Sequence, residues 1–367
     1  MYYITILLLF TFSVIEMNYD LSTRRKQKFI YFSFLILFLQ TGLRWETGTD
    51  WNPYLNNFLL SDSIVVVLAN VLIGFELGYG LLVYAVRLIT DDYTVFLLIH
   101  AFIYLFLIFK SIKKLYSFTF LPLLIFYVLT IGLLGSNRQL IAVALCLYSL
   151  SFALERKKLK FFTIILIAFL FHSSAILFGI YYFLNKKIKP IYIFSILILS
   201  FIVGKTNIPL LLFSEIGNLL DGASLNKIDN YSDKDALGDF SLSIIGLVRR
   251  IIYLVLFLSY YSMLSKKVKN FNIFFNGFLV GLVFYLLFSD SLLILVNRGS
   301  IYFNIMEIFL ISSLINLFKD RRSKNIFIVF LLLYSFYLFH QSISVYSDLF
   351  IPYKGIFINQ DLNRTLY

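Results

Sequence analysis

Long apolar runs limit what this chain can fold into more than any other feature of its sequence. A helix needs about 20 mostly apolar residues to cross the hydrocarbon core of a bilayer. With 60% hydrophobic and 14% charged residues, the chain has too little polar surface to cover a water-soluble core. Apolar runs of spanning length lie near 2–17, 28–43, 93–109, 119–135, 138–154, 161–184, 190–204, 241–264, 271–289, 299–318 and 325–346. The sequence therefore predicts an all-α, polytopic membrane bundle of about 10–12 transmembrane helices, in a single domain over 1–367.

The basic residues behind the net charge of +12 are predicted to set the membrane topology, and no nucleic-acid partner is expected. Lys and Arg fall in short clusters between the apolar runs, as the positive-inside rule predicts for a cytoplasmic face. The single cysteine, Cys146, excludes an internal disulfide and a cysteine-built metal site. The first run lacks a basic start and a cleavage site, so we expect a retained span. The basic clusters lie at 24–28, 110–114, 155–160, 185–189, 266–269 and 319–324.

The basic clusters also orient the chain. If 24–28 is cytoplasmic, segment 44–62 lies outside, and the acidic stretch 205–240 is a predicted periplasmic loop. Residues 161–184 separate two basic clusters but suffice for only one crossing. We therefore expect 161–184 and 64–90 to be broken or re-entrant helices, with breaks at 171–175 and 74–80. The alternative is that one basic loop lies outside.

Polar side chains crowd the stretch "RWETGTDWNPY" at 44–54. Arg44, Glu46 and Asp50 share it with both tryptophans, and Tyr54 follows four residues after Asp50. One interpretation is an interfacial cap with an aromatic belt and a snorkelling arginine. The cap explains the two indoles. It explains two carboxylates and a guanidinium less well, so the other interpretation is a functional site.

Two further polar residues interrupt apolar sequence. Arg138 begins a run on the predicted outer face, where positive charge opposes the insertion rule. His172 lies in "FLFHSSAILF". It is either a packing residue bonded to a serine or a general base or proton relay, because its pKa lies near the working pH.

A second group of arginines lies late in the chain. Arg249 and Arg250 lie inside an apolar run, and Arg298 and Tyr302 share one helix face. Insertion of one charged side chain at the centre of a membrane helix costs about 2.5–3.5 kcal/mol of free energy, so such residues need partners or a function. Guanidinium is the preferred partner of phosphate, and several arginines aimed at one outer cavity predict an anionic ligand beside lipid, such as a lipid diphosphate.

Five motifs, in this order, resemble the EpsG-like family of Wzy-type bacterial polysaccharide polymerases. They are "GLRWETGTDWNPYLNNF", "FELGYGLLVYAV", "NRQLIAVAL", "AFLFHSSAILF" and "NRGSIYF", and the resemblance covers about 40–310. Glu76 matches the glutamate of the family's Glu-x-Gly-Tyr pattern. Thr47 stands where the family usually has valine, which is a mild departure.

The resemblance implies a multi-pass protein of the bacterial cytoplasmic (inner) membrane, with an active site that faces the periplasm. The implied reaction transfers a growing O-antigen, capsule or exopolysaccharide chain from undecaprenyl diphosphate to the non-reducing end of the next lipid-linked repeat unit. The substrate-binding candidates are Arg44, Tyr54, Glu76, Arg138, Arg249, Arg250, Arg298 and Tyr302. His172, Asp50 and Glu46 are the alternative proton acceptors.

No cofactor is expected, and the absence of a metal-binding pattern predicts metal-independent transfer. The expected partners are the undecaprenyl-diphosphate-linked oligosaccharide and the lipid bilayer; a chain-length regulator and a flippase are candidate partners. Three rival functions share part of this chemistry: a lipid-linked oligosaccharide flippase or transporter, an O-antigen ligase, and a membrane acyltransferase that uses His172. The paired halves typical of many transporters are not seen in the sequence.

Overall fold

The computed structural model is helical, and it divides the chain into two compact units that are described here one at a time. Unit 1 comprises Met1–Tyr182 and Leu314–Tyr367, and unit 2 comprises Phe183–Ser313. Within the described residues there is no strand, only isolated bridges that pair Gly355 with Arg44 and with Ile358. Most of the predicted periplasmic loop at 205–240 lies outside the described residues, which are 1–72, 74–211, 244–292, 296 and 298–364.

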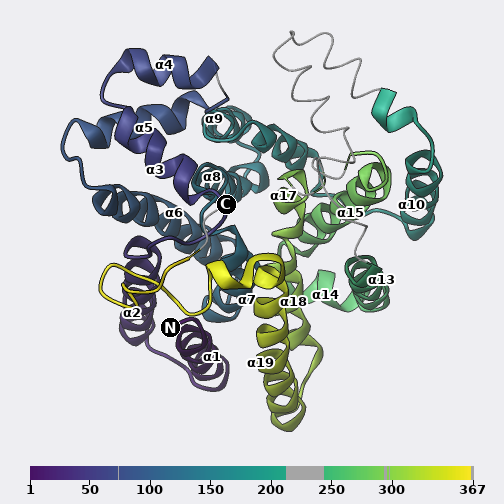
Figure 1. The fold of residues 1–367 in the computed structure, drawn as a ribbon. Helices are drawn as coiled ribbons and strands as arrows, with labels where there is room; N and C mark the ends of the chain where they lie inside the picture. Colours follow the sequence, from purple (N-terminus) through teal and green to yellow (C-terminus); the bar gives the residue numbers. More distant parts are fainter. Residues whose placement is uncertain (73, 212–243, 293–295, 297, 365–367) are drawn as a thin grey trace. The chain divides into compact units, whose positions relative to one another are not determined.

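Two long apolar helices form the centre of unit 1. Helix α6 (Tyr93–Leu115) packs along α8 (Asn137–Leu154), with α2 (Thr23–Gly42) on α6 and α9 (Lys158–Phe169) on α8 (Figure 1). The Asp92 carboxylate begins α6 by accepting a hydrogen bond from the Thr94 N–H at 2.7 Å, a cap of the kind that satisfies an otherwise unpaired donor. This pair supports the motif loops at their N-terminal ends.

Three more helices pack together in unit 1. Helix α7 (Phe120–Thr130) contacts both α1 (Tyr2–Asn18) and α19 (Arg321–Ile343). The Glu16 carboxylate of α1 accepts bonds from the first N–H groups of α7, at 2.8 Å from Thr119 and 2.9 Å from Phe120. A carboxylate at a helix N-terminus complements the helix dipole, so Glu16 fixes where α7 starts.

Both predicted helix breaks in unit 1 are confirmed. Segment 64–90 divides into α4 (Ile64–Leu72) and α5 (Leu77–Arg87), which pack against each other. After α9 the chain turns at 170–172 and continues as the 3₁₀-helix η2 (Ser173–Phe183). The two breaks meet, because the Gly78 N–H donates to the Leu170 carbonyl at 2.7 Å.

The second broken segment also turns back on itself. Arg156, in the turn before α9, donates through Nη1 to the Tyr182 carbonyl at 2.8 Å and stacks over the Tyr182 ring. Both ends of 158–182 therefore lie together, as a re-entrant segment requires. The preceding Glu155 carboxylate pairs with Lys114 and Lys157, and these bonds hold the pKa of Glu155 at about 2.

Unit 2 is built on α15 (Phe271–Phe288). Helix α10 (Pro190–Gly204) approaches it so closely that a Cβ on Gly204 would lie 2.0 Å from the Leu286 carbonyl oxygen. The predicted span 241–264 is bent by 72° between Ser259 and Tyr261, and the run 299–318 is also divided. The other helices that pack on α15 are α13 (Ile244–Ser259), α14 (Tyr261–Lys267), α17 (Ile301–Asn304) and α18 (Glu307–Ser313).

The chain is a helical, multi-pass membrane protein. Among the described residues, four helices are long and apolar enough to cross a bilayer, or five if the bent pair is one span. Shorter apolar helices accompany them, so the total of about 10–12 crossings stays a prediction. The four long helices are Tyr93–Leu115, Asn137–Leu154, Phe271–Phe288 and Arg321–Leu349.

Candidate functional site

Arg44 lies inside unit 1 and ties three helices together. Its side chain is 1% exposed and donates to the Thr41 carbonyl and to Asn137 Oδ1, the latter at 2.6 Å. The Asn137 carbonyl accepts in turn from His100 Nε2 at 2.8 Å. Burial lowers the pKa of the Arg44 guanidinium, but arginine stays protonated in proteins. This placement favours a structural contribution over direct contact with substrate.

The loop after Arg44 packs against the turn that precedes α8. Gly48 (φ +87°) and Gly135 (φ +112°) both adopt left-handed backbone conformations that favour glycine. A Cβ on Gly48 would lie 2.1 Å from the Leu134 carbonyl oxygen and 2.9 Å from the Gly135 Cα. The "TGT" and "LGSNR" segments are therefore in backbone contact, which only glycine permits.

Arg138 is the centre of a polar cluster that also includes Tyr54 and Glu76. Its Nε donates to the Tyr54 hydroxyl at 3.0 Å, and its Nη1 donates to Glu76 Oε2 at 2.6 Å and to the Gly74 carbonyl at 2.9 Å. The side chains of Arg138 and Glu76 remain 21% and 18% exposed. Among the described residues, Nη2 of Arg138 makes no hydrogen bond. The guanidinium is thus held in place with one terminal nitrogen available to a ligand.

Tyr54 supports this cluster as a neutral group. It lies on the short helix α3 (Trp51–Leu60), where burial raises the pKa of its phenol. Tyr54 and Trp51 belong to one buried aromatic cluster, with Trp51 5.3 Å from the Tyr93 ring. Trp51 is therefore a core residue, which the interfacial interpretation did not anticipate. Asp50 precedes α3 and accepts from Thr49 Oγ1 at 3.3 Å.

His172 lies beside the same cluster, in the break after α9. The second Glu76 oxygen, Oε1, accepts from the Ser173 N–H at 3.3 Å, and His172 Nδ1 bonds to Ser174 Oγ at 2.7 Å. The two helix breaks therefore bring Glu76, Arg138 and His172 into one neighbourhood. Within the described ranges, no group of three or more His, Cys, Asp or Glu side chains suits a metal ion.

The remaining predicted residues belong to unit 2. Arg249 Nη2 lies 3.8 Å from Glu307 Oε2, and Glu307 is 1% exposed. Arg250 donates through Nη1 to the Gly246 carbonyl at 3.1 Å, and its guanidinium lies 4.3 Å from the centre of the Tyr285 ring. Glu307 is therefore a buried carboxylate beside the Arg249 guanidinium.

Two predicted residues differ in exposure within unit 2. Tyr302 is fully buried on α17, whereas the Arg298 side chain is exposed. The sequence predicts that these side chains share one cavity with Arg138, and this stays a prediction. Glu307 is not among the site residues that the sequence predicts.

Sequence reasoning missed the residues that fix Glu46. The Glu46 carboxylate bonds to Lys354 Nζ, and the Glu46 carbonyl accepts from Arg364 Nη1 at 2.7 Å. These basic residues lie about 300 positions further along the chain, and no periodicity or spacing links them to the loop. Asn137 was also missed, although it stands directly before Arg138 in the quoted motif.

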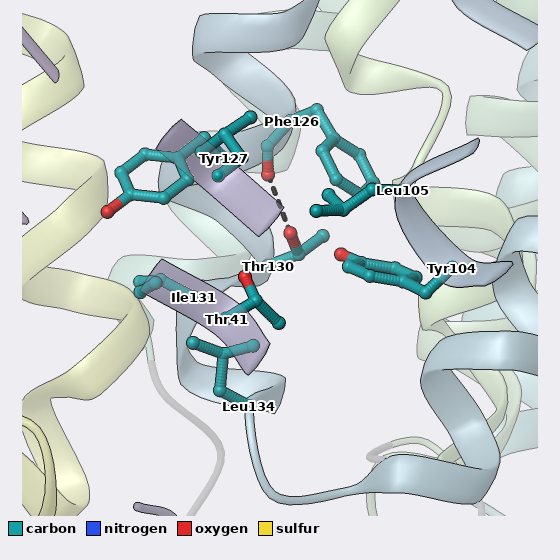
Figure 2. Close-up of a pocket in the computed structure, with 9 residues that line it drawn as sticks. Thr41, Tyr104, Leu105, Phe126, Tyr127, Thr130, Ile131 and Leu134 are labelled. Atoms are coloured by element: carbon teal, nitrogen blue, oxygen red, sulfur yellow. Dashed lines mark hydrogen bonds between the residues drawn. The ribbon is translucent and has the colours of Figure 1, made fainter. Parts of the chain in front are cut away.

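A small cavity is lined by residues of α2, α6 and α7 (Figure 2). Thr41, Tyr104 and Thr130 line it together with apolar side chains, and Thr130 Oγ1 donates to the Phe126 carbonyl at 2.8 Å. Its volume of about 20 Å³ suits one water molecule and excludes a sugar. The cavity is therefore no candidate for the substrate site.

Comparison with known proteins agrees with these motifs. No curated protein and no solved structure matches the chain. The model of the EpsG family matches residues 27–355, which include the Arg44 loop, both helix breaks, the arginines of unit 2 and Lys354. The chain therefore belongs to the EpsG family, and with it to the polysaccharide-polymerase type of membrane protein.

Proposed function

We propose that this protein polymerises oligosaccharide repeat units at the outer face of the cytoplasmic membrane. The growing glycan is transferred from undecaprenyl diphosphate to the non-reducing sugar of the next lipid-linked unit. Family membership supports the polymerase class. The observation that carries the reaction is the part-exposed Arg138 guanidinium, which Glu76 and Tyr54 hold where two helix breaks meet.

The chemistry needs charge stabilisation and one proton acceptor. The acceptor hydroxyl oxygen bonds to C1 of the donor sugar, the bond between C1 and the phosphate oxygen breaks, and the electron pair leaves with the diphosphate. A fixed guanidinium stabilises the negative charge that develops on the departing phosphate. The donor is already activated, so no nucleotide sugar is required.

His172 is the proton acceptor in this proposal. His172 belongs to the loop whose Ser173 N–H donates to Glu76, the carboxylate that also binds Arg138. Imidazole takes up a proton near neutral pH. Asp50 is the second candidate, because its carboxylate precedes α3 and is only weakly bonded.

Arg249, Arg250 and Arg298 of unit 2 are the other substrate-binding candidates of the proposal, and Arg249 Nη2 lies 3.8 Å from Glu307 Oε2. A diphosphate carries several oxygens, more than one guanidinium can contact. We assign these arginines and Tyr302 to the same substrate. A chain-length regulator and a flippase remain proposed partners.

Deletion of the gene separates this proposal from its rivals. We expect loss of the polymerase to leave single repeat units on the surface lipid. Loss of a ligase leaves finished chains on the carrier, loss of a flippase leaves no units outside, and loss of an acyltransferase leaves chain length unchanged. A normal ladder of glycan lengths in the deletion strain contradicts the proposal.

Substitution of Arg138 tests the site itself. We expect Arg138→Ala to abolish the glycan ladder and Arg138→Lys to restore little of it, because lysine keeps the charge but lacks the planar fork. The matched control is Arg322→Ala, in the exposed first turn of α19. Immunoblots of membranes check that each variant is present.

The proton acceptor is tested with purified protein and a lipid-linked repeat unit. Removal of a general base slows turnover by about 10²–10⁴-fold. We expect this loss for His172→Gln and a smaller loss for Asp50→Asn. The reverse order assigns the role to Asp50.

A further inference from the structure

The segment that follows α19 lies against the Arg44 loop. In Figure 1 it is the yellow segment beside α2. The Trp45 N–H donates to the Lys354 carbonyl at 3.0 Å, and the Ile356 N–H donates to the Leu43 carbonyl at 3.0 Å. A Cβ on Gly355 would lie 2.9 Å from the Leu43 carbonyl oxygen. The two backbones are therefore paired at close range.

Side chains of the same segment bind Glu46. Lys354 is 5% exposed, and its ammonium bonds to the Glu46 carboxylate and to the Leu362 carbonyl. Arg364 Nη1 donates to the Glu46 carbonyl at 2.7 Å and to the Leu349 carbonyl at 2.8 Å. Glu46 is thus bonded at its backbone and at its side chain.

Glu46 needs such support because its backbone is strained. Its φ is +45°, in the left-handed region that residues with a Cβ avoid. Strained conformations persist only where the surrounding contacts over-determine them. Here Lys354 and Arg364 supply those contacts.

The strained residue lies upstream of the proposed site. Gly48, two residues on, touches the turn before Arg138, and Tyr54 on α3 bonds to Arg138 itself. The position of the loop therefore sets the position of Asp50, Tyr54 and Arg138 together.

We infer that Lys354 and Arg364 are positioning residues for the proposed reaction, and that Glu46 is their anchor point and not a proton acceptor. A general base needs a carboxylate oxygen that reaches the acceptor hydroxyl. The Glu46 carboxylate instead faces a buried ammonium. The inference rests on the proposed function.

A charge exchange distinguishes an anchor from a base. Glu46→Lys and Lys354→Glu should each lower the amount of polymer at least ten-fold. The double exchange should restore a large part of that amount. If Glu46 is the base, the double exchange stays inactive and Lys354→Met remains active. That result overturns the inference.

Kinetics separate positioning from simple loss of folding. Lys354→Met should lower kcat and leave KM near its wild-type value, with unchanged amounts in the membrane. The control is Lys160→Met in the exposed first turn of α9, which should match wild type. A Lys354→Met protein with wild-type kcat contradicts a positioning role.

Crosslinking tests the contact without the reaction. In a Cys146→Ala background, Leu43→Cys and Ile356→Cys should be joined by a short thiol crosslinker, and Lys354→Met should reduce the yield at least two-fold. An undiminished yield argues against Lys354 as the anchor. This readout holds even if the protein proves not to be a polymerase, so the two failures can be told apart.

Discussion

Asn137 and Arg138 are neighbours whose side chains serve different parts of the molecule. Asn137 is buried and binds Arg44, while Arg138 is part-exposed and binds Glu76 and Tyr54. Successive residues of a helix point about 100° apart, so one turn of α8 presents both groups. Asn137 therefore links the buried Arg44 to the part-exposed Arg138, its neighbour in the chain.

Arg298 provides a prediction at the residue scale. We expect Arg298→Ala to abolish chain growth while the protein stays in the membrane, because the exposed side chain is a proposed ligand of the diphosphate. Glycan ladders and membrane immunoblots measure the two effects. Ladders of wild-type length remove Arg298 from the proposed site.

At the scale of elements, the two broken helices of unit 1 supply residues of the proposed site. Irregular backbone is tolerated at membrane depth only where it is buried in protein or lines a cavity. Here the breaks at 74–76 and 170–172 meet through the bond between Gly78 and Leu170. Glu76 and His172 come from these breaks and not from continuous helices.

Gly48→Ala tests the contact between the two motif loops. Left-handed strain alone costs about 1–3 kcal/mol, and the added Cβ would lie 2.1 Å from the Leu134 carbonyl oxygen. We expect the variant to lose both thermal stability in detergent and activity. Gly179→Ala is the control, since its Cβ would meet Phe162 at an ordinary 3.7 Å.

The breaks of unit 1 were predictable, and other features were not. The sequences "GFELGYG" and "FHSSA" interrupt apolar runs with glycine or polar residues, which is a local signal. The bend at Tyr260 lies in "LSYYSM", where no glycine or proline marks it. The Glu46–Lys354 pair joins distant positions, so no local pattern contains it.

At the scale of the whole molecule, we expect the basic clusters to lie on the cytoplasmic face. Arg156, in the 155–160 cluster, bonds to Tyr182, which precedes the 185–189 cluster in the sequence. This contact favours a re-entrant segment 161–184 over the alternative in which one basic loop lies outside, and the topology stays a prediction.

Cysteine labelling tests that topology. In the Cys146→Ala background, Lys157→Cys and Lys187→Cys should both resist a membrane-impermeant maleimide in intact cells. Asp62→Cys, on the exposed turn predicted to lie outside, should react. Labelling of Lys187→Cys but not of Lys157→Cys contradicts a re-entrant segment.

The bond between Glu46 and Lys354 has a consequence for how the protein is made. Its partners are 308 positions apart, and ribosomes add about 5–20 residues each second. The N-terminal loop therefore waits roughly 15–60 s for its C-terminal partner after it has left the ribosome. If Lys354 positions the proposed site, an incomplete nascent chain holds no finished site, and catalysis begins only once synthesis and insertion are complete.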